Sequence, residues 1–455
     1  MVPKASRGWV APSPGTQRVT AKILAFFLLG IALTDCRQTP REPVTLHYSY
    51  SWNEDRPELK ALLQQFTRET GIRVKNNPIP QMTREYVDLA RGLLADSYGP
   101  DVVNTDLIWS ALLEPDLIDL RPYLAPEISQ LEPQLVTSYT VNGKLVAVPF
   151  NVPLGSLEYR ADLLRAYGYD HPPRTWTELE TMAERIQRGE RRKGRKDFWG
   201  YVWQGAVSES LVCDALEWQA SAGGGRIIEP DGTISVNNPA AIGSWQRAKR
   251  WIGWISPPSV LAYRELDSML VFDSGTAAFD RTWLLTPMTR TGQARQIARR
   301  VRPPVVKTGF SRMPAGAGGS VGALGGTGMA VSIHSMHRSE AIALVRYLLR
   351  ALMRVGENGG PDGGWSQTEL SERSSILERE ASLAGPSRTP VILARPSTAT
   401  GSKYKEASKA YINAVHSVLA GQTEAGEAAA ELEKQLIAIT GFRTGPPPAG
   451  DKAIR

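Results

Sequence analysis

Cysteine and histidine are scarce in this chain, which narrows the chemistry that it could perform. Its 455 residues include 2 cysteines and 5 histidines. Cys36 directly follows a short apolar run near the start and is assigned to an export leader, as argued below. Cys213 then has no partner, and the fold must be stabilised by its core without a disulfide. His334 and His337 could share a helical face, but no carboxylate or cysteine completes a metal-ligand set around them. We therefore expect neither a metal nor a cofactor.

Motifs for nucleotide binding and for nucleophilic catalysis are missing or out of context. No GxxxxGKS or GxxxxGKT sequence occurs, and the glycine-rich residues 316–328 never form GxGxxG between a strand and a helix. Residues 318–322 (GGSVG) match GxSxG, but a loop precedes them, and a loop and strand are expected after them where a nucleophile elbow needs a helix. A serine hydrolase is therefore not supported. Paired carboxylates for glycoside cleavage stay an alternative, because spacing in sequence does not give separation in space.

Long hydrophobic runs are absent, and one short run lies near the start of the chain. Residues 23–33 (ILAFFLLGIAL) follow four basic residues, and their length of 11 falls short of the about 20 residues that a bilayer requires. This pattern is typical of a signal peptide. Residues 33–36 (LTDC) resemble a bacterial lipobox, although Asp35 stands where a small residue is usual. We expect residues 1–36 to be a signal peptide with Cys36 as the lipidation site; an ordinary leader or an uncleaved anchor is the alternative.

The charge balance gives no support for nucleic-acid binding. The net charge is +7, of which the leader carries +3, and the basic run at 185–196 is typical of a solvated loop. Hydrophobic residues make up 42% and charged residues 22%, as in a globular protein. The exported part exceeds the usual size of one domain, so two domains or lobes are expected. The last residues, 442–455, are rich in glycine and proline and are predicted to be disordered.

Strands and helices alternate along the first part of the chain. Leu59, Leu62, Leu63 and Phe66 form an i, i+3, i+4, i+7 stripe, which predicts a helix. Strands are predicted at 44–49, 72–75 and 101–103, and helices at 57–70, 86–95 and 107–113. This alternation predicts an α/β fold with a mostly parallel sheet that is covered on both faces.

An aromatic block at residues 197–228 is the most distinctive segment. It places Trp203 and Trp218 among glycines and among polar residues such as Gln204 and Glu217. Aromatic faces beside amide and carboxylate groups suit a small polyhydroxylated ligand, whose C–H faces stack while its hydroxyls form hydrogen bonds. Ordinary core packing is the alternative interpretation, because large aromatic residues are mostly buried.

Several segments together resemble the bacterial extracellular solute-binding proteins that serve ABC transporters for sugars. They are GPDVV at 99–103, NGKLVAVPF at 142–150, LEYRADLLRAYGYDHPPRTWTELETMAERI at 157–186, VFDSGTAAFDRTW at 271–283, GALGGTGMAVSIHSMHRSEA at 322–341 and VILARPS at 391–397. The aromatic block, together with the SPP sequence at 256–258, is especially similar to the trehalose/maltose-binding branch.

This resemblance implies a two-lobed, periplasmic-binding-protein-like (type II) α/β fold with a ligand cleft between the lobes. It places residues 44–148 and 310–331 in the first lobe and residues 149–309 and 332–441 in the second. Such proteins close on one solute and perform no reaction, so the chain is not expected to be an enzyme. The implied partners are a small sugar-like solute and the membrane subunits of an ABC permease. We expect an exported monomer, periplasmic or on the outer face of the cytoplasmic membrane, anchored there by lipid.

The resemblance also assigns ligand contacts. The family's early acidic contact falls on Glu54, the aspartate after the third strand on Asp106, the aromatic platform on Trp283 and the late arginine on Arg395. Carboxylates and a guanidinium can form paired hydrogen bonds with vicinal hydroxyls, and tryptophan can stack on a pyranose ring. Each residue also has a structural alternative: a helix N-terminal acid, a helix cap, a core aromatic and an ion-pair partner, respectively.

Three positions depart from the disaccharide-binding pattern. Pro153 stands where the family usually has an aspartate, Asn151 replaces an aromatic residue, and Thr327 replaces the tryptophan of a glycine-rich loop. Asn151 and Thr327 are nevertheless candidate ligand contacts through their polar side chains. Losing a carboxylate and a stacking ring should weaken binding of trehalose or maltose, so a different glycoside, a polyol or a small polar osmolyte is also compatible with the sequence.

Three functions follow from these observations. The first is a non-catalytic receptor that captures a disaccharide, a glucosylated polyol or a similar solute for an ABC importer. The second is an exported, two-lobed enzyme that acts on carbohydrates. The third is a sensor that presents its bound form to a signalling partner. A receptor would change its melting temperature with ligand and leave the ligand unchanged, which separates the first function from the second.

Overall fold

A computed structural model of the chain describes residues 43–51, 57–79, 92, 99–284, 307–357 and 391–448. Residues Thr45–Arg455 form one compact unit, to which all of the following refers. The predicted signal peptide with Cys36, the candidate ligand contact Glu54 and nearly all of the predicted helix at 86–95 lie outside the described residues. In the part that is described, no helix combines the length and the apolar character needed to cross a membrane.

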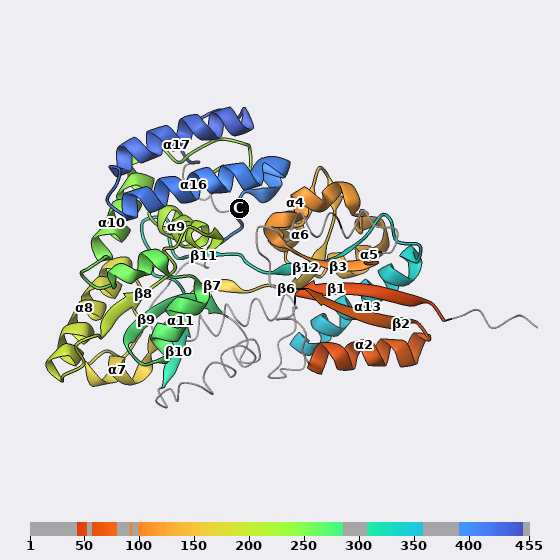
Figure 1. The fold of residues 1–455 in the computed structure, drawn as a ribbon, viewed down its shortest axis with the longest axis horizontal. Helices are drawn as coiled ribbons and strands as arrows, with labels where there is room; N and C mark the ends of the chain where they lie inside the picture. Colours follow the sequence, from red (N-terminus) through yellow and green to blue (C-terminus); the bar gives the residue numbers. More distant parts are fainter. Residues whose placement is uncertain are drawn as a thin grey trace, which may run out of the picture. The chain divides into compact units, whose positions relative to one another are not determined.

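A five-stranded sheet contains the strands predicted in the first part of the chain. Its members are β1 (Thr45–Ser51), β2 (Arg73–Ile79), β3 (Val102–Asp106), β6 (Val148–Asn151) and β12 (Thr327–Val331). Their order is β2-β1-β3-β12-β6 (Figure 1). β1 runs parallel to β2 and β3, which confirms the predicted parallel pairing of these strands. The other two pairings of this sheet are antiparallel, so the expectation of a mostly parallel sheet is wrong. β12 is antiparallel to both of its neighbours, because the chain returns to this sheet from the other direction.

Helices α2 (Pro57–Thr70) and α13 (Arg338–Glu357) pack together against this sheet. Leu59, Leu63 and Phe66 of the predicted stripe on α2 are buried, and the Phe66 ring centroid lies 5.3 Å from that of Tyr347 on α13. α13 also contacts β12, β6 and α5 (Arg121–Ile128). The predicted helix at 57–70 is therefore confirmed, since its apolar stripe faces the core.

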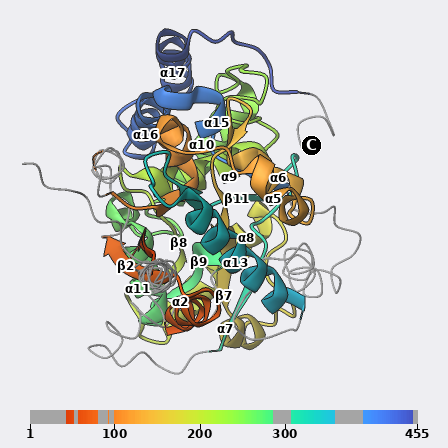
Figure 2. The same cartoon turned by 90° about the vertical axis from the view of Figure 1, so that its right-hand side faces the viewer.

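A second sheet has four strands and a different set of helices. Its members are β7 (Leu154–Arg160), β8 (Trp199–Val202), β9 (Ala277–Leu284) and β10 (Thr308–Ser311), in the order β10-β7-β9-β8. The helices that contribute to its core include α8 (Trp176–Arg192), α9 (Glu209–Ser221), α10 (Pro239–Trp251), α16 (Tyr404–Leu419) and α17 (Ala425–Thr440). α16 and α17 lie side by side in both views (Figure 1, Figure 2).

The aromatic block at 197–228 forms part of the core around this second sheet. Tyr201, Trp203 and Trp218 are almost completely buried. The rings of Trp203 and Trp218 meet edge to face with centroids 5.0 Å apart, and Trp218 also meets Trp251 of α10 at 5.6 Å. Edge-to-face packing adds to the large apolar area that these rings remove from water. Of the two interpretations of this block, core packing is the one that the structure shows for these three rings.

Three segments lie with a different sheet from the one expected. β10 pairs with β7, and β11 (Val321–Ala323) pairs with β13 (Val391–Leu393) while contacting β7 and α9, so these residues of 310–331 accompany the second sheet. α13, expected with the second lobe as part of 332–441, packs against the first sheet. The reason is that α13 directly follows β12, which is inserted between β3 and β6.

The C-terminal segment is also more ordered than its composition predicts. Ile234 exchanges backbone hydrogen bonds with Arg443 and Gly445, and Phe442 packs against the core of the second sheet. The prediction of a disordered tail is therefore wrong for residues 442–445. Glycine and proline allow this extended path, and the partner strand segment lies about two hundred residues earlier in the chain, where composition cannot reveal it.

Candidate ligand-binding site

Three of the predicted ligand contacts lie side by side on neighbouring strands. Thr327, the first residue of β12, pairs with Asp106 at the end of β3 on one side and with Asn151 at the end of β6 on the other. Residues opposite each other in an antiparallel pair carry their side chains on the same face, about 4.5–5.5 Å apart at Cβ. The sheet therefore presents a carboxylate, a hydroxyl and an amide in one row.

Asp106 also caps the short helix that follows its strand. Its Oδ1 atom accepts a hydrogen bond from the backbone N–H of Ile108 at 3.0 Å. Burial raises the pKa of Asp106, the charge of Arg395 and the Ile108 N–H oppose this rise, and the carboxylates of Glu209 and Glu265 add to it. The helix cap considered as an alternative role is thus real. It is compatible with ligand binding, because 23% of the Asp106 side chain is still exposed.

Arg395 joins Asp106 to the helices of the second sheet. Its Nη2 atom lies 3.6 Å from Asp106 Oδ1, and its Nη1 atom donates to Glu209 Oε2 at 3.2 Å. Glu209 also accepts hydrogen bonds from Tyr404 Oη at 2.8 Å and from Ser408 Oγ. The Arg395 side chain is 5% exposed, and its Nε atom has no hydrogen-bond partner among the described residues. Arg395 is therefore an internal ion-pair partner with one buried donor left over.

Trp283 lies near this row at the end of β9. A Cβ atom placed on Gly325 would come within 2.9 Å of the Trp283 ring, and Gly325 donates its N–H to the Pro153 carbonyl at 3.0 Å. Gly326 has φ +108° and a Cβ there would collide with the Asn151 carbonyl, so only glycine fits. These close approaches hold the strand ends beside Asn151, Trp283 and Thr327 together.

The arrangement can form hydrogen bonds with a solute and stack on a ring. A row of polar side chains beside a partly exposed indole suits a solute that has many hydroxyls and an apolar ring face. Ser320, of the GxSxG match, donates to the Met313 carbonyl at 2.6 Å and is followed by β11, where a nucleophile elbow needs a helix. No cluster of three or more His, Cys, Asp or Glu side chains suited to a metal was found among the described residues.

Two acidic residues near the site were not selected from the sequence. Glu209 lies within the aromatic block at 197–228, and Glu265, an exposed residue at the start of α11 (Glu265–Asp273), lies outside every segment that carries the family resemblance. Both are close enough to affect the pKa of Asp106. A single sequence carries no signal for Glu265, because α11 and β3 are brought together only by the fold.

Comparison with known proteins tests the resemblance seen in the sequence. The model of the family described as bacterial extracellular solute-binding protein matches residues 51–351. A Deinococcus radiodurans protein named "Probable ABC transporter-binding protein" is 36% identical over 421 residues, which cover 91% of this chain and 98% of that protein.

Solved structures give the same result. Maltose-bound MalE3 of T. maritima is 30% identical with a TM-score of 0.70, covering 87% of this chain and all of that one. UgpB of Mycobacterium tuberculosis, in complex with glycerophosphocholine, is 15% identical with a TM-score of 0.67, and the match covers 88% of this chain and 98% of the UgpB chain. At this low identity the match supports the fold alone. The fold is the two-lobed type II fold of periplasmic binding proteins, and this chain belongs to the bacterial extracellular solute-binding protein family of ABC transporters.

Proposed function

We propose that this protein is the substrate-binding component of an ABC importer and that it captures a sugar or a sugar-like solute, such as a disaccharide or a glucosylated polyol. The observation that carries the proposal is the row of Asp106, Thr327 and Asn151 on neighbouring strands, with Trp283 close by. A carboxylate, a hydroxyl and an amide can together match several sugar hydroxyls, and an indole face can cover the C–H face of a ring. The maltose-bound state of the T. maritima relative supports this class of ligand.

In this proposal the five-stranded sheet with α2, α5 and α13 forms one lobe. The four-stranded sheet with the helices of its core forms the other. The chain passes between them where β6 leads to β7 and where β11 leads to β12. Ligand contacts made from both sheets would favour the closed form over the open one, and the membrane subunits of the permease would recognise the closed form.

The ligand site comprises Asp106, Asn151, Trp283, Thr327 and Arg395, with Glu54 as a further contact. Pro153 places a ring, and no carboxylate, beside Gly325 and Gly326. We infer that this difference, together with Thr327, lowers the affinity for trehalose and maltose and favours a solute that needs one acidic partner fewer. Arg395 contributes through Asp106 and through its Nε donor, which lacks a partner among the described residues.

Export and membrane anchoring complete the proposal. Residues 1–36 would direct the chain out of the cytoplasm, and lipidation of Cys36 would retain it as a monomer on the outer face of the membrane. Metabolic labelling with a palmitate analogue tests this directly, because Cys36→Ser should lose the label and enter the soluble fraction.

A thermal-shift screen of disaccharides, glucosylated polyols and monosaccharides tests the ligand class. A ligand present at 100 times its Kd stabilises a protein by about 2.7 kcal/mol, which is easily detected. The recovered ligand should be chemically unchanged, since an enzyme would convert it. If no sugar or polyol raises the melting temperature, the proposal is wrong.

Two substitutions test the site with the ligand that the screen identifies. Trp283→Ala removes a stacking face and Asp106→Ala removes a charged hydrogen-bond acceptor, so each should lower affinity by about 10- to 100-fold. Isothermal titration calorimetry measures the change, with Arg443→Ala as the control. Arg443 forms an exposed ion pair with Asp231 far from the row in sequence and should have no effect on affinity. Unchanged affinity in both site variants would remove these residues from the site.

A further inference from the structure

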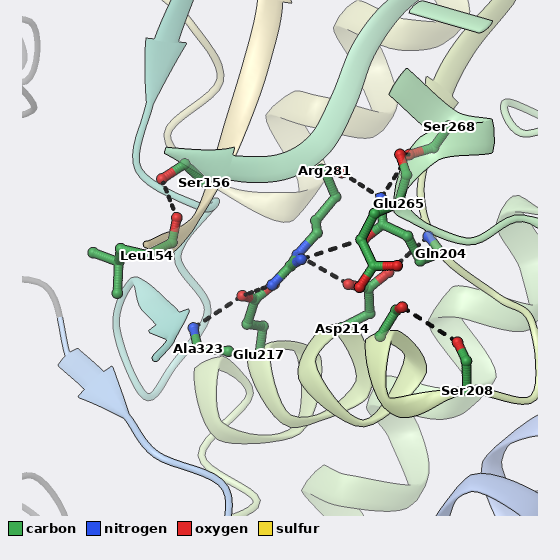
Figure 3. A network of polar contacts seen from close by, with 11 residues as sticks. Leu154, Ser156, Gln204, Ser208, Asp214, Glu217, Glu265, Ser268, Arg281 and Ala323 are labelled. Atoms are coloured by element: carbon green, nitrogen blue, oxygen red, sulfur yellow. Dashed lines mark hydrogen bonds and ion pairs between the residues drawn. The ribbon is translucent and has the colours of Figure 1, made fainter. Parts of the chain in front are cut away.

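Arg281 of β9 lies buried among acidic side chains of α9 (Figure 3). Its Nη2 and Nε atoms donate to Glu217 Oε1 and Oε2 at 2.6 and 3.0 Å, which is a two-pronged pairing. Its Nε atom also lies 2.9 Å from Asp214 Oδ1, and Nη1 donates to Gln204 Oε1 at 3.3 Å. The guanidinium group is therefore held in one plane and one orientation.

These charges have no access to water. The side chains of Arg281, Asp214 and Glu217 are all 0% exposed. Burial opposes the charge of Arg281, but the carboxylates of Glu217 and Asp214 outweigh it and hold the pKa of Arg281 above its ordinary value. Burial also raises the pKa of Asp214. Desolvation offsets much of the attraction in a buried ion pair, so such a pair adds little net stability. The role of this cluster therefore lies in the groups that it orients.

The guanidinium orients Trp283. Its central carbon lies 4.3 Å from the centroid of the Trp283 ring, so it covers one face of the indole. The two residues are i and i+2 on one strand and therefore point to the same side of the sheet. With one ring face covered by Arg281, a ligand that stacks on Trp283 must use the other face.

The same cluster holds the segment that contacts the edge of this ring. Glu217 Oε1 accepts the backbone N–H of Ala323 at 2.9 Å, two residues before Gly325, which approaches Trp283. A Cβ atom on Gly155, which pairs with Trp283 across β7 and β9, would collide with Glu217 and Arg281. One buried cluster thus sets the positions of the ring and of the segment that packs against it.

We propose that Arg281 is a positioning residue for solute binding: held by Glu217 and Asp214, it fixes the Trp283 indole in the orientation that stacks on the ligand. This inference rests on the proposed function for its ligand class. The planar, forked shape of the guanidinium is essential to it, because a lysine at this position could keep the charge but could neither pair with Glu217 at two points nor lie flat against the indole.

A double-mutant cycle with maltose as the probe tests this role. Arg281→Lys should lower maltose affinity about tenfold, which corresponds to about 1.4 kcal/mol. In the Trp283→Leu background the same Arg281→Lys change should alter the remaining affinity less than twofold, because its effect passes through the ring. An equal loss in both backgrounds would show that Arg281 acts on the structure in general, and the inference would be wrong.

A second readout does not depend on any ligand. The emission of Trp283 is obtained as the difference between each protein and its Trp283→Leu counterpart. Arg281→Lys should shift this emission, and Arg191→Lys should leave it unchanged. Arg191 is a matched control, since its guanidinium carbon lies 4.4 Å from the centroid of Trp199 in the same sheet.

The two readouts separate the possible failures. If the unmodified protein binds maltose too weakly to measure, as Pro153 and Thr327 allow, the ligand found in the thermal-shift screen replaces maltose in the cycle. If no sugar or polyol binds, the proposed function fails and the Trp283 emission alone decides the inference: a shift in Arg281→Lys upholds it and no shift overturns it. If Arg281→Lys does not fold, Glu217→Gln takes its place, because it loosens the guanidinium from the other side while Arg281 keeps its charge. Glu217→Gln should then lower maltose affinity and shift the Trp283 emission, and unchanged values of both would overturn the inference.

Discussion

Two arginines of this protein each lie between a pair of carboxylates, yet the two groups differ in their contact with water. We call them the closed cluster, Arg281 with Asp214 and Glu217, and the open cluster, Arg395 with Asp106 and Glu209. Every side chain of the closed cluster is fully buried. In the open cluster only the arginine is nearly buried, while Asp106 and Glu209 keep 23% and 31% of their side-chain surface exposed.

The geometry of the charges follows the same division. The closed cluster has a two-pronged pairing at 2.6 and 3.0 Å, whereas Arg395 reaches its partners at 3.2 and 3.6 Å through two separate nitrogen atoms. Short, forked contacts without water hold a group in place. Longer contacts beside water can exchange partners at little cost. In the functions proposed above, similar charges position Trp283 in the closed cluster and meet a solute in the open cluster.

The largest expected effect comes from removing the arginine of the closed cluster. Arg281→Met should lower the free energy of unfolding by about 3–5 kcal/mol, because two buried carboxylates lose their compensating charge. Urea denaturation measures this loss. Adding Asp214→Asn and Glu217→Gln to the same variant should recover part of it, since no uncompensated buried charge then remains.

The control for this prediction is an exposed ion pair of similar length. Arg443 and Asp231 lie 2.9 Å apart with 74% and 58% of their side-chain surfaces exposed, so Arg443→Met should leave the unfolding free energy nearly unchanged. If Arg281→Met lowers the free energy of unfolding no more than Arg443→Met does, the buried closed cluster contributes no more to stability than an exposed ion pair.

A smaller effect is expected from the matching change in the open cluster. Arg395→Met should lower the free energy of unfolding by about 1–3 kcal/mol, because water can still hydrate the two carboxylates that it leaves. Arg395→Met should change the free energy of ligand binding more than the free energy of unfolding, because Asp106 loses the charge that opposes the rise of its pKa. The same urea denaturation series, combined with calorimetric titration of the ligand, measures both. Equal destabilisation by Arg281→Met and Arg395→Met would contradict the division into a closed and an open cluster.

Local sequence patterns predicted the elements better than their partners. The stripe of Leu59, Leu63 and Phe66 predicts α2 because helix periodicity is a local property. The pairing of β12 between β3 and β6, and the bonds of Arg443 and Gly445 to Ile234, join segments far apart in the sequence. For the same reason the sequence left core packing as one of two interpretations of the aromatic block: Trp218 meets Trp203 within the block, but it also meets Trp251 of another helix, a contact that only the fold reveals.

The candidate site shows the same limit. Family resemblance selected Asp106, Asn151 and Thr327, and the structure brings these three together, but nothing in the sequence itself places them on adjacent strands. Arg281 was missed although a signal was present: it lies two residues before Trp283 in the segment AAFDRTW, which forms strand β9, so the two share a face. A charged residue in that position needs buried partners, and this requirement could have directed attention to the carboxylates of α9.

The smallest expected effect tests the open cluster by its response to pH. Burial raises the pKa of Asp106 above its ordinary value of 3.8, so the folded protein binds this proton more tightly than the unfolded chain does. The stability that the protonated carboxyl contributes is therefore present below pH 3.8 and is lost as the pH rises through the raised value.

Asp106→Asn has no such group and keeps the helix cap, because asparagine caps as well as aspartate. Its unfolding free energy should lie within about 0.5 kcal/mol of that of the unmodified protein, and the difference between the two should shift in favour of the variant as the pH rises from 4 toward 7. Urea denaturation at a series of pH values measures this difference, and a shift in the opposite direction would mean that Arg395 and the Ile108 N–H outweigh burial at Asp106. In that case the carboxylate would be a fixed ion-pair partner like those of the closed cluster, and the distinction between the two clusters would fail at this residue.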